Sequence, residues 1–344
     1  MTHQAPWQSQ PHDREFFERE LSSFVPNSIY DAHVHAWPAG ALSLDGAPRS
    51  ATHADYQHLI RALHPHSSVD ALIIPFPAPR EMIESSNDWV ANEVEAAGAN
   101  TRGLLLVRPE DDPERVREQV RQRRLHGLKC YHSYAAIEPT WDAQIPDYLP
   151  EPLVKVADEE GWIITLHLVR PRGVADAGNI HWIRHYCRRY PNIKLILAHS
   201  ARGFQPSHNF QGLPQLRGLG NLYFDSSANC EAMAHLAILR IMGHDRLLYG
   251  SDFPVSHLRG RSVAADDSFL WLYEKTPVWG EKHARIDPVL VGLEHLRSLK
   301  WACWAERLTD AQVEAVFAGN ATKLFGVGSA SAASGEVVPS SSLC

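Results

Sequence analysis

The sequence is poor in cysteine and has no long apolar run and no excess of basic residues. The cysteines are odd in number, scattered and without a C-x-x-C pair, which argues against a disulfide framework and suits a reducing cytoplasm. They are Cys130, Cys187, Cys230, Cys303 and Cys344. No apolar run approaches the ~20 residues that span a bilayer, and the polar, acidic start does not resemble a secretory signal, so no membrane association is expected. A net charge of −7 argues against a nucleic-acid partner.

What the sequence does contain is a series of short runs rich in Val, Ile and Leu. Each run is too short for a helix and too continuous for a half-exposed strand, which is typical of buried parallel strands. Eight of them alternate with stretches that predict helices, at spacings of about 25–40 residues, and this indicates a (β/α)₈ TIM barrel. The predicted strands are 29–35, 69–76, 102–107, 127–132, 162–169, 193–199, 221–226 and 246–252, and the clearest helices are 81–98, 112–125, 150–160 and 179–190.

The predicted organisation is one α/β barrel domain over residues 28–326. Residues 1–27 form an N-terminal helical extension with an amphipathic helix at 12–24, and the small, polar residues 327–344 are expected to be a disordered tail. Two Trp-rich stretches, 268–280 and 295–308, predict extra C-terminal helices beside the barrel, and 309–325 predicts a closing helix pair. A doubly wound sheet is the alternative, but no G-x-G-x-x-G follows the first strand.

The first predicted strand contains the segment YDAHVH. Asp31, His33 and His35 occupy every second position, so they would share one face of the strand. Histidine accounts for 20 of 344 residues, so random placement alone gives roughly one H-x-H motif against average usage. The motif therefore needs partners from elsewhere in the chain.

Such partners stand where other predicted strands end, which is where a barrel of this kind gathers its chemistry. Imidazole and carboxylate groups are natural ligands of Zn²⁺ and similar ions. Burying them unpaired would cost on the order of a few kcal/mol each. The polar residues at strand ends are His33 and His35, then Lys129, Tyr131 and His132, then His167, His199 and Asp252. Together they predict a metal site.

The chain resembles the amidohydrolase superfamily, and within it the amidohydrolase-2 branch, through seven segments that occur in the family's order. The resemblance covers about residues 28–326, and the last two segments are specific to the branch, whereas H-x-H is not. The segments are YDAHVH, GLKCY, TLHLV, LILAHSARG, NLYFDSSA, LLYGSDFPV and VFAGNATKLFG.

The resemblance implies a mononuclear metal site in which His199 acts as general base or orients the attacking water. Asp252 would accept the proton of that water while it contacts the metal, and Asp31 would fix an imidazole through its other nitrogen. The single divalent ion, expected to be Zn²⁺, would be bound by His33, His35, His167 and Asp252.

Four further residues bear on the substrate. In binuclear members of the superfamily, a lysine at the position of Lys129 is carboxylated and bridges two metals. In many members of this branch a lysine in a similar strand stays a plain amine, which we expect here as a partner for substrate charge. Arg202 and Arg170 follow His199 and His167 in loops, where each is either a surface residue or a partner of a substrate carboxylate or phosphate. Tyr131 would line the site.

The predicted function is metal-dependent hydrolysis of an ester, lactone or amide bond in a small, anionic molecule. The alternative is metal-dependent decarboxylation of an aromatic or unsaturated acid at the same site, since the branch includes decarboxylases. A third hypothesis is that the protein is a barrel that has lost catalytic activity and only binds a ligand. A small-molecule substrate is the expected partner, and the sequence leaves a homo-oligomer open.

Overall fold

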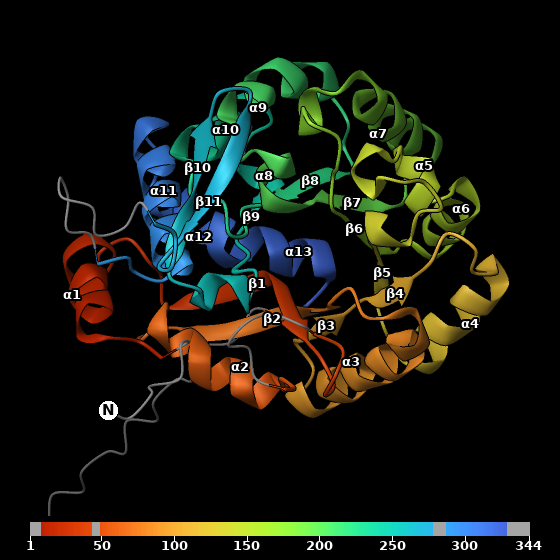
Figure 1. The fold of residues 1–344 in the computed structure, drawn as a ribbon, viewed down its shortest axis with the longest axis horizontal. Coiled ribbons are helices and arrows are strands. Elements are labelled where there is room, and N and C mark those ends of the chain that lie inside the picture. Colours follow the sequence, from red (N-terminus) through yellow and green to blue (C-terminus); the bar gives the residue numbers. More distant parts are fainter. Residues whose placement is uncertain (1–7, 43–48, 278–286, 329–344) are drawn as a thin grey trace, which may run out of the picture.

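The strands of the protein, seen in a computed structural model that describes residues 8–42, 49–277 and 287–328, form a ring of parallel neighbours (Figure 1). All eight predicted strands are confirmed, and the third is divided at Leu104. They are β1 (Ser28–Ala36), β2 (Ser68–Pro75), β3 (Arg102–Gly103) with β4 (Leu105–Val107), β5 (Gly127–Cys130), β6 (Ile163–Leu166), β7 (Lys194–Leu197), β8 (Leu222–Asp225) and β9 (Leu247–Leu248).

The strands pair in chain order, from β1 to β3 and from β4 to β9. The ring is closed between its first strand and the segment that follows β9. The amide of Ala32 donates to the carbonyl of Tyr249 at 2.8 Å, that of Asp252 to His33 at 2.8 Å, and that of His35 to Phe253 at 3.0 Å. These bonds complete the predicted (β/α)₈ barrel.

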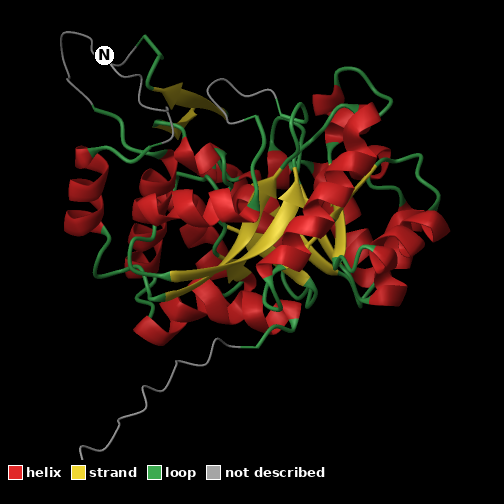
Figure 2. Cartoon of the chain, turned by 90° about the horizontal axis from the view of Figure 1, so that it is seen from below, coloured by secondary structure: helices red, strands yellow, loops and turns green. Residues whose placement is uncertain are grey.

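Helices cover the outside of the strands (Figure 2). α4 illustrates why they form, because Asp112 caps its first turn by accepting from the amide of Arg115, Pro113 starts it, and Val116 and Val120 bury one face. The helices are α1 (Pro11–Glu20), α2 (His53–Leu59), α3 (Ile83–Ala97), α4 (Pro113–Gln122), α5 (Ile145–Tyr148), α6 (Glu151–Glu160), α7 (Ala177–Arg189), α8 (Ala198–Arg202), α9 (Pro206–Gly212), α10 (Ala232–Ile241), α11 (Val291–Ala305), α12 (Asp310–Glu314) and α13 (Asn320–Phe325). No helix in the described part of the chain is long and apolar enough to cross a membrane.

One element differs from its prediction. The first Trp-rich stretch is not a helix, because residues 268–273 form β11 (Ser268–Tyr273), which pairs antiparallel with β10 (Gly260–Ala265). Its side chains alternate in the two-residue period of a strand, and Asp266 takes the left-handed φ of 52° that the turn requires. The second stretch forms α11 as predicted, while residues 278–280 lie outside the described residues.

The N-terminal helix is tied to the barrel by a buried ion pair. Asp13 of α1 accepts from Arg259 at 2.6 and 3.1 Å, just before β10 begins. Most of the predicted tail, from residue 329 on, lies outside the described residues, so its disorder stays a prediction. The four described cysteines are free and buried, as expected for a reduced protein; Cys344 lies outside.

Candidate metal centre

Asp31 organises the backbone beneath the site. Its carboxylate accepts from the amides of His33 at 3.1 Å and Ser251 at 2.7 Å, and from the hydroxyl of Tyr56 at 2.8 Å. Burial raises the pKa of Asp31 to about 7, against the effect of these hydrogen bonds. The carboxylate therefore joins β1 to the segment after β9. It contacts two backbone amides and a tyrosine hydroxyl, and not the imidazole that the resemblance implied.

The imidazole of His33 is held instead by Asp225, at the end of β8. His33 Nδ1 lies 2.9 Å from Asp225 Oδ2, and burial lowers the pKa of His33 to about 4, so the ring is neutral. His35 Nδ1 donates to the carbonyl of Ile74 at 3.0 Å. Because each Nδ1 carries the ring proton as a donor, each Nε2 is left with its lone pair. Sequence reasoning missed Asp225, although it ends an apolar run as the other site residues do.

Asp252 faces both lone pairs. Its Oδ1 lies 3.7 Å from His33 Nε2 and 3.3 Å from His35 Nε2. Burial alone would raise the pKa of Asp252, but the surrounding imidazoles of His199, His35 and His33 lower it to about 2, so the carboxylate is ionised. Three acceptors thus converge in a buried space, and acceptors at such distances need a cation or a proton between them. This donor set fits a divalent metal ion.

His199 and His167 stand on the other side of Asp252. His199 Nδ1 lies 3.8 Å from Asp252 Oδ2 and donates to the carbonyl of Ser227 at 3.2 Å. His199 Nε2 then accepts from His167 Nδ1 at 3.1 Å. Asp252 therefore presents one oxygen to the β1 histidines and the other to His199.

His199 begins a stretch of four consecutive left-handed residues. His199, Ser200, Ala201 and Arg202 have φ of 58°, 51°, 58° and 57°, where L-residues pay roughly 1–2 kcal/mol each. The surroundings hold the turn in place, because Asp225 Oδ1 accepts from the His199 amide at 3.0 Å and Asn209 donates to the Ser200 carbonyl at 2.9 Å. The turn determines how the side chains of His199 and Arg202 project from the end of β7.

The predicted ligands are brought together in part. In the described part of the chain, two groups have ligand atoms within 4.8 Å of one another: His33, His35 and Asp252 in one, and His33, His199 and Asp225 in the other. His167 belongs to neither group and is joined to the site through His199. Its role as a ligand stays a prediction.

Lys129 lies inside the barrel beside an aromatic ring. Its Nζ is 4.8 Å from the centroid of Tyr131, whose hydroxyl donates to the carbonyl of Pro75 at 3.0 Å. Burial lowers the pKa of Lys129, and the charges of Asp225 and Asp252 act in the opposite direction. The hydrogen bond therefore holds the Tyr131 ring in place, and the Lys129 amine packs against that ring.

The two predicted arginines differ in their partners. Arg170 forms an ion pair with Asp176 at 3.0 Å and donates to the carbonyl of Asp142 at 2.9 Å, so its charge is used within its own loop. The Arg202 guanidinium lies between the rings of Trp141, at 5.0 Å, and Phe269, at 5.7 Å, and donates to the carbonyl of Leu168 at 3.3 Å. Among the described residues, no carboxylate oxygen lies within 4.0 Å of it.

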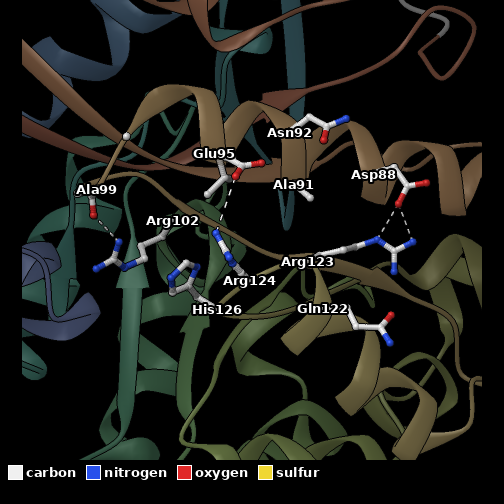
Figure 3. A pocket seen from close by; sticks show the side chains of 12 residues that line it. Asp88, Ala91, Asn92, Glu95, Ala99, Arg102, Gln122, Arg123, Arg124 and His126 are labelled. Atoms are coloured by element: carbon white, nitrogen blue, oxygen red, sulfur yellow. Dashed lines mark hydrogen bonds and ion pairs between the residues drawn. The ribbon is translucent and has the colours of Figure 1, made fainter.

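A cavity of about 820 Å³ lies at the opposite end of the barrel, where Arg102 and His126 stand at strand starts (Figure 3). Two of the arginines here have acidic partners, whereas Arg102 donates to backbone carbonyls. Arg123 pairs with Asp88 at 2.7 Å, and Arg124 with Glu95 at 3.8 Å. None of the metal-centre histidines and carboxylates lines this cavity, because they gather at the carboxyl ends of the strands.

Comparison with known proteins gives a family match and several similar folds. The family model described as amidohydrolase matches residues 30–327. No curated protein matches the chain. A structure described as a probable 2-pyrone-4,6-dicarboxylic acid hydrolase from Acinetobacter baumannii, with citric acid bound, is 15% identical at a TM-score of 0.55 and covers 88% of this chain and 100% of its own.

Two similar structures are decarboxylases. The 5-carboxyvanillate decarboxylase of Sphingomonas paucimobilis is 13% identical at a TM-score of 0.54, covering 88% of this chain and 100% of its own. A dihydroxybenzoic acid decarboxylase of Polaromonas sp. JS666, with manganese and 2-nitroresorcinol bound, is 15% identical at a TM-score of 0.50, covering 88% and 97%. At these identities the likeness shows a shared fold.

Proposed function

The chain belongs to the amidohydrolase family, and from that premise we propose that it hydrolyses an ester, lactone or amide bond of a small, anionic substrate with the help of one divalent metal ion. The observation that carries the proposal is the convergence of His33 Nε2, His35 Nε2 and Asp252 Oδ1 in a buried space. Two imidazole nitrogens and an ionised carboxylate placed in this way are suited to binding a cation.

These three residues, with His167 as the further expected ligand, would hold the ion. A divalent ion in such a site lowers the pKa of water to roughly 7 and so supplies a nucleophile at neutral pH. Zn²⁺ is the first ion to test because imidazole suits it, and Mn²⁺ is the second because a similar structure contains it. Asp225, through His33, and Ile74, through His35, keep the ligand nitrogens in the required tautomer.

Asp252 would move the proton in hydrolysis. Water adds to the substrate carbonyl carbon and loses a proton to Asp252 Oδ2, the oxygen that faces His199. The bond from the carbonyl carbon to the leaving oxygen or nitrogen then breaks, and the same proton passes to the leaving atom. His199 steadies the ionised carboxylate during the transfer, which is a general-base role for Asp252 with His199 as its positioning partner.

Arg202 would bind the negative group of the substrate, with Lys129 as a plain amine deeper in the barrel. A guanidinium binds a carboxylate through two parallel hydrogen bonds, about twice as strong as neutral ones. We assign this role to Arg202 rather than Arg170 because Asp176 already neutralises Arg170. Arg202→Ala should lower kcat/KM by about 30- to 1000-fold, mostly through KM, while the protein keeps its metal.

Decarboxylation of an aromatic acid is the second candidate, and the aromatic rings on both sides of Arg202 favour it. Turnover in ¹⁸O-labelled water separates the two reactions. Hydrolysis places the label in the new carboxylate of the product. Release of CO₂ from an aromatic acid, with no label in the other product, would replace hydrolysis by decarboxylation.

A further inference from the structure

The left-handed turn from His199 to Arg202 is held on one side by α9 and α10, which lie beside it in the fold (Figure 1). Ser200 in this turn is fully buried, and its hydroxyl lies 2.8 Å from Nδ1 of the equally buried His235 on α10. Asn209 on α9 donates to the Ser200 carbonyl at 2.9 Å and to a carbonyl of α10 at 3.3 Å. The turn is therefore joined to α10 both directly, through a side chain, and through Asn209.

The neighbours of His235 determine which of its ring nitrogens carries the proton. Nε2 lies 3.0 Å from the carbonyl oxygen of Asn229, which can only accept, so Nε2 donates. The Ser298 hydroxyl, also 3.0 Å from Nε2, donates to the carbonyl of His295 at 2.7 Å and can accept from the same N–H. Burial lowers the pKa of His235 to about 4, so the ring is neutral at pH 7 and Nδ1 keeps its lone pair. The Ser200 hydroxyl therefore donates to Nδ1.

Asn229 holds the same turn from the segment that follows β8. Its Nδ2 donates to the carbonyl of His199 at 3.2 Å, and its Oδ1 accepts from the amide of Glu231 at 2.9 Å. Because the Asn229 carbonyl is the acceptor for His235, these two residues also fix each other. The first two residues of the turn are therefore held by hydrogen bonds from outside the metal centre.

The position of the His199 ring depends on this turn. Its Nδ1 lies 3.8 Å from Asp252 Oδ2, the oxygen that would take the proton of water. A left-handed φ is unfavourable for a residue with a side chain, so a turn that loses a bond would relax toward the φ values that L-residues prefer. Residues 199 and 200 share a planar peptide, so relaxation at Ser200 would also move the His199 ring relative to Asp252.

We propose that Ser200 and His235 are positioning residues, which hold His199 against Asp252 through the hydrogen bond from the Ser200 hydroxyl to His235 Nδ1. The proposal rests on the proposed function, because it is in that reaction that His199 steadies the Asp252 carboxylate. Ser200 and His235 act through His199 and not on the substrate. Their contribution should therefore be found in kcat rather than in KM or metal content.

Ser200→Ala tests the bond with the smallest change. Ala201, the next residue, has φ of 58°, so alanine is compatible with the turn, and the substitution removes only the hydroxyl. In crystal structures of the metal-containing proteins, the distance from His199 Nδ1 to Asp252 Oδ2 should be about 1 Å longer in the variant than in the wild type. On the substrate found by labelling, kcat should fall by about 10- to 100-fold, with KM and metal content within about 2-fold of wild type.

Two substitutions of His235 separate the hydrogen bond from packing. His235→Asn keeps an acceptor, Oδ1, close to the position of Nδ1, whereas His235→Leu fills more of the space and has no acceptor. The proposal predicts that the Asn variant keeps more of kcat, and a packing role predicts the reverse. His64→Leu is the matched control, because His64 is also buried and bonds the Tyr249 hydroxyl at 2.7 Å. It should lower the free energy of unfolding and leave kcat within a factor of about two.

An unchanged distance between His199 and Asp252 in Ser200→Ala would overturn the proposal. So would a His235→Leu variant that keeps as much of kcat as His235→Asn. The crystal structures do not depend on turnover. A turn that moves as expected, in a protein that catalyses no hydrolysis, would support the positioning role and refute the proposed function alone.

Discussion

The two ends of the barrel both carry clusters of charged residues, but the clusters are built differently. At the carboxyl ends of the strands, Asp31, Asp225 and Asp252 are buried, and both oxygens of Asp31 and of Asp225 accept hydrogen bonds from the chain itself. At the other end, Arg123 and Asp88 pair at the surface, where the Asp88 side chain is 62% exposed. Water stabilises the second cluster without help from the fold. The first must be held by the fold, so its composition reflects function more than solubility.

Of the substitutions that distinguish the two ends of the barrel, Asp252→Asn should have the largest effect on activity. The amide cannot take the proton of water and binds a cation weakly, so kcat/KM should fall by about 10²–10⁴-fold. Steady-state kinetics on the substrate found in the labelling experiment measures this. Asp88→Asn, the matched change at the other end, should leave activity within a factor of about two. A similar loss in both variants would remove the distinction between the ends.

Asp225→Asn should have the next largest effect. The amide no longer provides the charge that fixes the tautomer of His33, so metal affinity or activity should fall by about 10- to 100-fold. Metal titration followed by activity assays gives the value. Normal affinity with normal activity would show that the bond between Asp225 and His33 serves packing only.

Lowering the pH should destabilise the folded protein through its buried histidines and leave the exposed ion pairs unaffected. Burial lowers the pKa of His64 to about 3 and those of His235 and His257 to about 4. The unfolded chain therefore binds more protons, so their contribution is complete above pH 6.5 and is lost as the pH falls from 6.5 to about 4. The slope should reach about 1.4 kcal/mol per pH unit for each histidine. Denaturant unfolding at pH 7.5, 6 and 5 measures it, and a constant free energy of unfolding would refute it.

Arg123→Gln should give the smallest effect. The exposed pair with Asp88 should contribute about 0.2–1 kcal/mol to the free energy of unfolding, decreasing with added salt. Denaturant melts at low and high salt test this. A loss of several kcal/mol would mean that the two ends are stabilised in the same way.

The sequence allowed the barrel to be predicted because buried parallel strands are continuous apolar runs that end in polar residues. The hairpin at 260–273 was missed because Trp and Leu at 268–272 are compatible with a helix, and the two-residue period covers only six residues. The apolar pattern therefore predicted elements reliably where it repeats along the chain, as in the barrel strands. It was less reliable in the hairpin, where it occurs only once.

The contacts of the site were harder to predict because they join distant parts of the chain. Asp225 and His33 are 192 residues apart, so no local pattern links them. Arg170 and Arg202 each follow a strand-end histidine by three residues, and only the position of Asp176 distinguishes them. The expectation that Asp31 holds an imidazole was wrong because its carboxylate bonds to backbone amides and Tyr56.

Metal content tests the central claim most directly. Inductively coupled plasma mass spectrometry of the purified protein should find one divalent ion per chain, which His33→Ala and Asp252→Ala lose and Arg123→Gln retains. Circular dichroism would confirm that the variants are folded. Full metal content in both the His33 and Asp252 variants would contradict the account, because the ion would then be bound elsewhere.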